Sequence, residues 1–291
     1  MAQIFDTEQT RKIDNGKAMH LLLTSSIDEA LNHNPFGENY CISSPPGMAK
    51  THETKLALSK LKNTDERLLF EGAASMAGFI IEFTTAVYLH ELSGSKKKLP
   101  VVLDDCDVLF EPKNANTTKK MFDQTKALKY TKMAKQIKPM CTDLQWEAIE
   151  HYSSPEKVGF SVPTDNVTFL IITNRHLHTH SQVERLQEGE LAHTKATELY
   201  AIRRRVQYEE INMKKDDLWG YIANVVWNHS ICETFMPNIT QSQKLEILEW
   251  CEKKWNKVTE RNLSLVEKMT KDMVRFPSNY KDVWANRYLE L

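Results

Sequence analysis

Short apolar runs alternate with segments of helical periodicity through the first two thirds of the chain. Five of these runs have the length and continuous apolar character of buried strands, at residues 39–43, 68–71, 100–103, 167–173 and 206–211. Buried strands separated by helices are typical of a parallel sheet that helices cover on both faces. The pattern therefore predicts an α/β fold around a five-stranded parallel sheet.

The pattern changes after about residue 212. Apolar residues then recur at spacings of three and four, as on helices with one buried face, at residues 218–227, 245–255 and 263–274. Thr240, which follows a break at Pro237 and has Gln243 three residues later, has the spacing of a capping box at a helix start. We therefore expect two domains, a core of residues 1–212 and a helical domain of residues 213–291.

Composition narrows the possible classes of protein. The chain has 291 residues, 41% of them hydrophobic, which excludes disordered and collagen-like proteins. Its 38 basic and 39 acidic side chains almost cancel, so the protein as a whole has no positive field that would attract nucleic acid. Five scattered cysteines without a C-x-x-C pair argue against a disulfide framework or a zinc ribbon. The first twenty residues lack a signal-peptide pattern. The most apolar stretch, residues 73–89, is too short and too polar to span a membrane. We therefore expect this stretch to form a buried helix. We expect a cytoplasmic protein, in the host cytoplasm if it is viral, without a membrane partner.

The first chemical signal is the sequence SPPGMAKT at residues 44–51, here called the lysine loop. It follows a predicted strand and precedes a predicted helix, which is the setting in which backbone N–H groups bind phosphate, with Lys50 on the β- and γ-phosphates and Thr51 on Mg²⁺. The usual pattern is G-x-x-x-x-G-K-[ST], but Ser44 and Ala49 replace its two glycines. A methyl group at Ala49 would crowd the phosphates or restrict the backbone angles.

The second signal is a pair of acids at the end of the apolar run LPVVLDDCDVLF, residues 99–110. In this position Asp104 would support Mg²⁺ and Asp105 would polarise an attacking water, whereas the alternative is a solvated turn. A third run ends at Asn174, whose side chain would hydrogen-bond the same water if that strand lies between the loop strand and the acid strand. The alternative for Asn174 is an ordinary turn.

Three consecutive arginines, Arg203, Arg204 and Arg205, precede the last predicted strand. A guanidinium is suited to neutralising the charge on a transferring γ-phosphate, often across a subunit boundary. The alternative is a solvated basic turn, and only one of the three is expected at a phosphate.

The order of these signals resembles that of the AAA+ ATPases, in particular the small AAA+ ATPases of bacteriophages, which are related in layout to clamp-loader subunits. The likeness covers nearly the whole chain and rests on VVLDDCDVLF, VTFLIITN and YAIRRRVQYEEINMKKDDL, at residues 101–110, 167–174 and 200–218. It implies a P-loop ATPase core with a helical lid, ATP and Mg²⁺ as ligands, and a homo-oligomeric ring or spiral.

The resemblance also implies roles for individual residues. Asp104 and Thr51 would support the metal, Asp105 stands where the family has its catalytic glutamate, Asn174 corresponds to the polar residue that senses the γ-phosphate, and Arg205 to the arginine finger. The nucleotide would lie on the lysine loop, at Pro46, Gly47, Met48, Ala49, Lys50 and Thr51.

Further departures from the family pattern bear on catalysis. Asp105 is one methylene shorter than glutamate, and Ser264 replaces the arginine expected in the lid, with Arg261 as the only nearby substitute. The main hypothesis is an ATPase that couples hydrolysis to remodelling or moving a macromolecule, with DNA in phage replication or packaging as the expected substrate. Two alternatives remain: a helicase of the superfamily-three kind, and a nucleotide-binding scaffold subunit that has lost catalysis and binds a protein partner.

Two further patterns bear on possible ligands. Residues 113–138 contain eight lysines and a single acid, Asp123, and this segment is either a DNA-binding surface or a solvated helix. His176, His178 and His180 alternate, as three ligands on one side of an extended chain would, but no cysteine or carboxylate lies beside them. We expect a polar loop there.

Overall fold

The computed structural model describes residues 5–32, 34, 37–60, 68–72, 75–123, 127–130, 136–154, 159–186 and 191–290. The chain forms two compact units. The first, here called the sheet unit, contains Ser26–Ser44 and Thr51–Glu210, and the second, the helical unit, contains Met1–Ser25, Pro45–Lys50 and Ile211–Leu291. The carboxyl-terminal boundary lies near the predicted residue 212. The N-terminal segment and most of the lysine loop, however, belong with the helical unit and not with the core, because their contacts are there.

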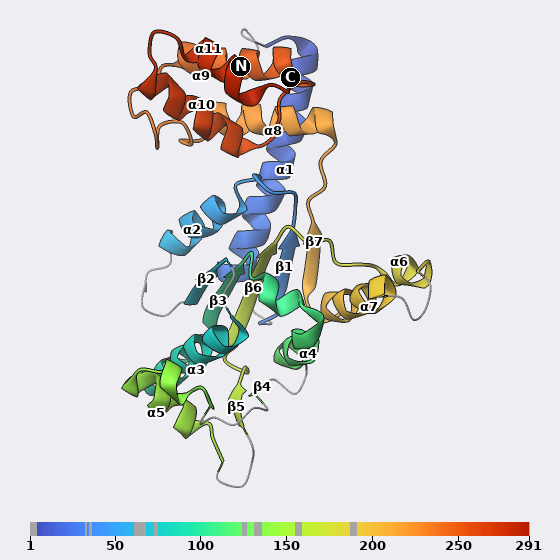
Figure 1. Ribbon diagram of the computed structural model, residues 1–291, viewed down its shortest axis with the longest axis vertical. Coiled ribbons are helices and arrows are strands. Elements are labelled where there is room, and N and C mark those ends of the chain that lie inside the picture. Colours follow the sequence, from blue (N-terminus) through green and yellow to red (C-terminus); the bar gives the residue numbers. More distant parts are fainter. Residues whose placement is uncertain are drawn as a thin grey trace. The chain divides into compact units, whose positions relative to one another are not determined.

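The sheet unit is built on one parallel sheet with the strand order β2 (Leu68–Glu71), β3 (Leu99–Asp104), β6 (Val167–Thr173), β1 (Tyr40–Ser43) and β7 (Gln207–Glu210) (Figure 1). These are the five strands that the apolar runs predict, and each bound lies within one residue of the predicted one. All seven residues of β6, the middle strand, are buried. The predicted α/β fold with a five-stranded parallel sheet is confirmed.

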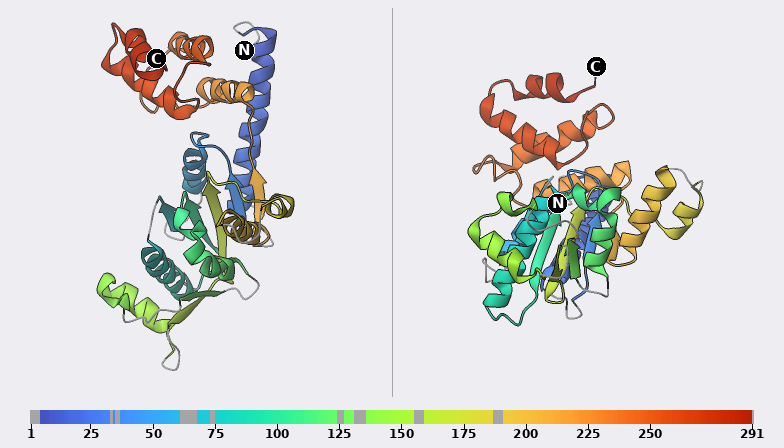
Figure 2. Two further views of the ribbon diagram at one scale, coloured as in Figure 1. Left: turned by 45° about the vertical axis from the view of Figure 1, so that its right-hand side comes forward. Right: turned by 60° about the horizontal axis from the view of Figure 1, so that its bottom comes forward.

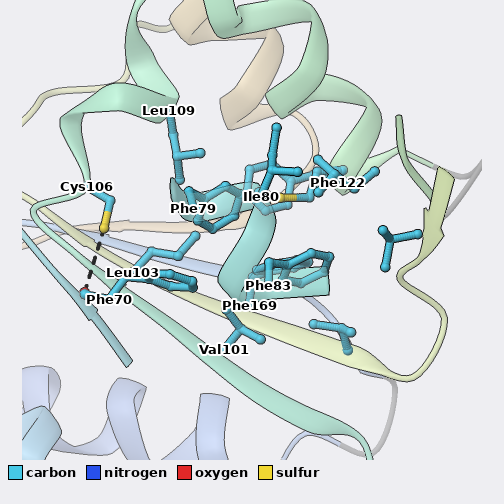
Figure 3. Packing of buried hydrophobic residues seen from close by; sticks show 14 of the residues in the cluster. Phe70, Phe79, Ile80, Phe83, Val101, Leu103, Cys106, Leu109, Phe122 and Phe169 are labelled. Atoms are coloured by element: carbon cyan, nitrogen blue, oxygen red, sulfur yellow. Dashed lines mark hydrogen bonds between the residues drawn. The ribbon is translucent and has the colours of Figure 1, made fainter. Parts of the chain in front are cut away.

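Helices flank this sheet, among them α2 (Lys50–Lys60), α3 (Met76–Leu92), α4 (Ala115–Phe122) and α7 (Leu191–Arg203) (Figures 1 and 2). Two shorter helices, α5 (Asp143–His151) and α6 (His180–Glu184), pack on α3 and α7. Helix α3 contains most of the apolar stretch predicted as a buried helix. Its Phe79 and Phe83 form a row of rings with Phe70 of β2 and Phe169 of β6, at centroid distances of 4.9, 5.8 and 5.7 Å (Figure 3). Within the described residues, no helix has the length and apolar character needed to cross a membrane.

The basic segment 113–138 is not one helix. Its described parts form a 3₁₀ turn at Pro112–Asn114, the helix α4, the strand β4 (Ala127–Tyr130) and a 3₁₀ turn at Lys138–Met140. Strand β4 pairs antiparallel with β5 (Phe160–Pro163) in a separate two-stranded sheet, and a further 3₁₀ turn covers Asp107–Phe110. Lys126, Lys132 and Lys135 lie outside the described residues.

The helical unit contains α8 (Lys215–Asn228), α9 (Gln241–Lys254), α10 (Leu263–Arg275) and α11 (Tyr280–Tyr288), together with the first part of α1 (Thr7–Asn32) (Figure 2). The three predicted helices correspond to α8, α9 and α10. The predicted capping box is confirmed, because the Thr240 hydroxyl accepts a hydrogen bond from the Gln243 N–H at 3.2 Å and Gln243 Oε1 accepts one from the Thr240 N–H at 2.9 Å.

Two glycines allow α1 and α8 to cross with their backbones in contact. A Cβ added to Gly220 would lie 1.9 Å from the carbonyl oxygen of Lys12, and one added to Gly16 would lie 2.3 Å from the amide nitrogen of Tyr221. Since any side chain would force the helices apart, glycine is required at both positions. The crossing also fixes the backbone of Tyr221, whose side chain is fully buried in the core of the helical unit.

Candidate functional site

The carboxyl edge of the parallel sheet collects the polar residues predicted to follow β3 and β6. Asp104 ends β3 in register with Ile172, and Asn174 follows Thr173, the last residue of β6. Because parallel strands end at the same edge, two neighbouring strands bring these side chains to one place. Strand β1, which leads into the lysine loop, ends at this edge on the other side of β6.

Asp105 and Asn174 are in direct contact at this edge. The side-chain amide of Asn174 donates to both carboxylate oxygens of Asp105, at 3.0 and 3.1 Å, and both residues are exposed to solvent. The backbone of Asp105 is left-handed, with φ of 50°, which an aspartate adopts more readily than most residues, and its N–H donates to the Ile172 carbonyl at 2.9 Å. The carboxylate is thus held at the solvent boundary, where it is able to orient or deprotonate a water.

Asp104 occupies a different environment from its neighbour. Its residue is only 5% exposed, and its carbonyl accepts a hydrogen bond from the Gly72 N–H beyond β2 at 3.0 Å. Two adjacent acids are therefore separated into a buried one and an exposed one.

The lysine loop contains two residues with left-handed backbone conformation. Gly47 and Ala49 have positive φ angles of 76° and 58°, so Ala49 adopts the left-handed conformation despite its side chain. The Lys50 side chain is buried, and its Nζ donates to the carbonyl of Pro45 at 3.0 Å. The replacement of glycine by alanine therefore does not prevent this conformation, although such a conformation costs about 1–2 kcal/mol for a residue with a Cβ.

The tip of the lysine loop is part of the helical unit. Met48 is 2% exposed and lies in the core of that unit, while the carbonyls of Gly47 and Met48 accept hydrogen bonds from the Leu263 N–H at 3.0 Å and the Tyr221 hydroxyl at 2.6 Å. A Cβ on Gly47 would lie 2.3 Å from the Cβ of Asn262, so glycine is also required here for space. Tyr221 belongs to no motif, so local sequence patterns do not identify it.

The lid residue proposed as a substitute cation is already engaged. The Arg261 guanidinium donates to the carbonyls of Trp255 and Asn256 at 2.8 and 3.2 Å, which fixes it on the helical unit. Asn262 caps α10 by accepting a hydrogen bond from the Leu265 N–H at 3.1 Å, and Ser264 lies in the first turn of that helix.

Arg205 lies at the other edge of the sheet. It precedes the first residue of β7, at the amino end of the strands, so the four-residue length of β7, about 13 Å at the usual rise per residue, separates it from the carboxyl edge. It donates to the Ala201 carbonyl at 2.6 Å and faces Asp123 at 3.5 Å. Within one chain, the structure does not bring Arg205 together with Asp105 and Asn174.

Arg205 and the exposed Arg204 line a polar cavity of about 520 Å³ at this amino edge; its other lining residues are Gly37, Glu38, Asn39, Phe122, Asp123, Val206 and Gln207. Arg203 points elsewhere. Its guanidinium lies 4.1 Å from the centre of the Tyr208 ring and donates to the Leu177 carbonyl at 2.6 Å, so this arginine secures the chain that follows β6.

The alternating histidines hold the same stretch of chain. His176 bridges Glu210, at 2.8 Å, and Gln182, at 2.9 Å, and burial together with the charge of His176 lowers the pKa of His178. His180 faces Glu184 at 3.2 Å. No group of three potential metal ligands occurs among the residues that the structure describes.

Several lysines of the basic segment are engaged within the chain. Lys113 pairs with Glu111 at 2.9 Å, Lys119 pairs with Glu198 at 2.7 Å, and Lys138 lies 4.6 Å from the centre of the Trp146 ring. Two of these lysines are therefore paired with acids, which offsets part of the positive charge that the composition implies.

No protein-family model matches this chain, and comparison with curated proteins found no similar sequence.

Proposed function

We propose that this protein is an ATPase that binds ATP with Mg²⁺ through the lysine loop and hydrolyses it with the acids of β3. The observation that supports this proposal best is the strand order. Strand β6, which ends at Asn174, lies between β1, which leads into the lysine loop, and β3, which ends at Asp104 and Asp105. The water-orienting role proposed for Asn174 requires β6 to lie between these two strands. If the three polar segments were unrelated solvated turns, no particular strand order would be required.

The residues present fit an ATP–Mg²⁺ complex. Gly47 and Ala49, on either side of Met48, have positive φ angles, Lys50 supplies a cation, and Asp104 supplies a buried carboxylate. Magnesium is usually held by one or two protein oxygens together with phosphate oxygens, so Thr51 and Asp104 are a sufficient set. When bound, Mg²⁺ would neutralise charge that develops on the phosphate oxygens.

Catalysis is assigned to the exposed acid. Asp105 would accept the proton of the attacking water, and Asn174 would hold that carboxylate and the water in line, a contribution typically worth about 10²–10⁴-fold in rate. Because Arg205 and Arg204 lie at the amino edge, either would act on a nucleotide bound by a neighbouring subunit. A homo-oligomeric ring or spiral, located in the cytoplasm, is therefore part of the proposal, with DNA in phage replication or packaging as the expected substrate.

Two observations favour a second candidate, the nucleotide-binding scaffold without turnover. Both oxygens of Asp105 already accept hydrogen bonds from Asn174, and the Arg261 guanidinium is fixed on backbone carbonyls. If the contact with Asn174 holds the Asp105 carboxylate away from the attacking water, ATP would bind and persist.

The test is the rate of phosphate release with and without Mg²⁺, single-stranded DNA and double-stranded DNA. The main proposal expects Mg²⁺-dependent turnover that Lys50→Ala abolishes together with ATP binding. Binding without turnover would favour the scaffold, whereas equal nucleotide affinity in Lys50→Ala and in the unmodified protein would contradict the assignment of the loop.

A further inference from the structure

Two hydrogen bonds hold the lysine loop in the helical unit, and they end on the carbonyl oxygens of consecutive residues. The Leu263 N–H donates to the carbonyl of Gly47, and the Tyr221 hydroxyl donates to the carbonyl of Met48. Each carbonyl belongs to the peptide group whose N–H is that of the next residue. The two anchors therefore also fix the N–H groups of Met48 and Ala49.

Peptide geometry decides the direction of those N–H groups. In a planar trans peptide the C=O and N–H bonds point to opposite sides, so a carbonyl turned toward the helical unit turns the N–H away from it. The Ala49 N–H donates no hydrogen bond to another residue in the described part of the chain. It is thus presented on the face of the loop opposite to the Met48 anchor, where an anion is able to accept it.

The anchor at Met48 is rigid. Tyr221 is fully buried, its backbone is fixed by the close crossing at Gly220, and the Met48 side chain is enclosed in the same core. The anchored peptide is also the one that leads into Ala49, which has φ of 58°. Because alanine leaves this conformation more readily than glycine, the loop depends on an external hydrogen bond to keep it.

We propose that Tyr221 is a positioning residue for the nucleotide: its hydroxyl holds the Met48–Ala49 peptide so that the Ala49 N–H faces the triphosphate. This inference rests on the proposed ATP site. It assigns to the helical unit a role that no motif marks, in which a neutral hydroxyl orients the loop and makes no contact with the ligand.

The test compares ATP affinity, by titration with a fluorescent ATP analogue, in four variants of the full chain. Tyr221→Phe removes only the hydroxyl and is expected to weaken binding by about three- to tenfold, the usual effect of one lost hydrogen bond. Ala49→Gly in the same chain should restore most of this loss, because glycine keeps the conformation without support. Tyr288→Phe is the matched control, since its hydroxyl is bonded to Asp272 in the same unit and away from the loop. Lys50→Ala reports on the ATP site itself.

The outcomes separate the two proposals. If the unmodified protein binds ATP and Lys50→Ala does not, but Tyr221→Phe binds as tightly as the unmodified protein, the role of Tyr221 is wrong and the ATP site stands. If the unmodified protein does not bind ATP, both fail. Should Tyr221→Phe not fold, amide hydrogen exchange of the unmodified protein decides the matter: ATP is expected to protect the Ala49 amide, and unchanged exchange there would overturn the inference.

Discussion

Replacing Ala49 by glycine is expected to stabilise the helical unit, although glycine usually destabilises. Ala49 has φ of 58°, which costs a residue with a Cβ about 1–2 kcal/mol. Against this, the greater freedom of glycine in the unfolded chain costs about 0.4–1 kcal/mol. The difference predicts a gain of about 0.5–1 kcal/mol in the free energy of unfolding.

A matched control variant is expected to change the free energy of unfolding in the opposite direction. Ala285 is exposed on α11 of the same unit and has helical geometry, so Ala285→Gly should lower the free energy of unfolding by about 1 kcal/mol. Urea unfolding followed by tryptophan fluorescence suits this comparison, because five of the six tryptophans (Trp219, Trp227, Trp250, Trp255 and Trp284) belong to the helical unit. If Ala49→Gly destabilises as much as Ala285→Gly, the left-handed conformation assigned to Ala49 is wrong, and with it the argument that the loop needs an anchor.

Three other predictions follow from the geometry. Asp105→Asn should leave ATP affinity within about twofold while lowering the hydrolysis rate by about 10²–10⁴-fold. Asp104→Asn, by contrast, should weaken Mg²⁺-dependent binding. If both variants show equal and mild effects on affinity and rate, the two acids form a structural turn. Gly220→Ala should lower the free energy of unfolding by about 3 kcal/mol, because its Cβ would lie 1.9 Å from a backbone oxygen, and a cost below about 1 kcal/mol in urea unfolding would show that α1 and α8 do not cross there. Arg205→Ala should bind ATP but not hydrolyse it, and once sedimentation shows an oligomer, mixing it with Lys50→Ala should recover part of the activity; mixtures that stay inactive at every ratio would exclude Arg205 as a finger acting between subunits.

The sheet was predictable because its strands are buried on both faces. Continuous apolar sequence is needed at every position of such a strand, so β3 and β6 are visible without knowledge of their neighbours. The contact between Asp105 and Asn174 then follows from topology, since neighbouring parallel strands end at one edge. The local apolar pattern and the order of the strands are therefore sufficient to predict the contact between Asp105 and Asn174.

Helix α1 was missed although its signal is present. Its buried positions include Ile13, His20, Leu23, Ile27 and Ala30, at spacings of seven, three, four and three. This is the repeat of one helical face, but a histidine and many charged residues dilute the apolar signal. The basic segment, expected to be either a DNA-binding surface or a solvated helix, is not one helix, because its described parts form α4, the strand β4 and 3₁₀ turns.

The attachment of the lysine loop to the helical unit was not predictable from local pattern. Met48 and Tyr221 are separated by 173 positions, and no spacing rule connects a carbonyl oxygen with a tyrosine hydroxyl so far along the chain. The engagement of Arg205 with Asp123 is similar, at a separation of 82 positions. In both cases the decisive contact depends on tertiary packing, which sequence periodicity does not encode.

Two departures from the pattern that this chain resembles, one in the lysine loop and one in the helical unit, bear on how the proposed site would bind the phosphates. Ala49 introduces strain where glycine is usual, Ser264 stands where the pattern has an arginine, and the Arg261 guanidinium is held on backbone carbonyls. In the proposed site the helical unit would contribute hydrogen bonds to the loop in place of a positive charge on the ligand. Neutral hydrogen bonds are screened by salt far less than charge pairs, so this contribution to ATP affinity should persist at ionic strengths that weaken the contribution of Lys50. An effect of Tyr221→Phe that keeps its size from low to high salt is therefore what orientation of the loop predicts, and an effect that disappears with added salt would indicate a change in charge at the site.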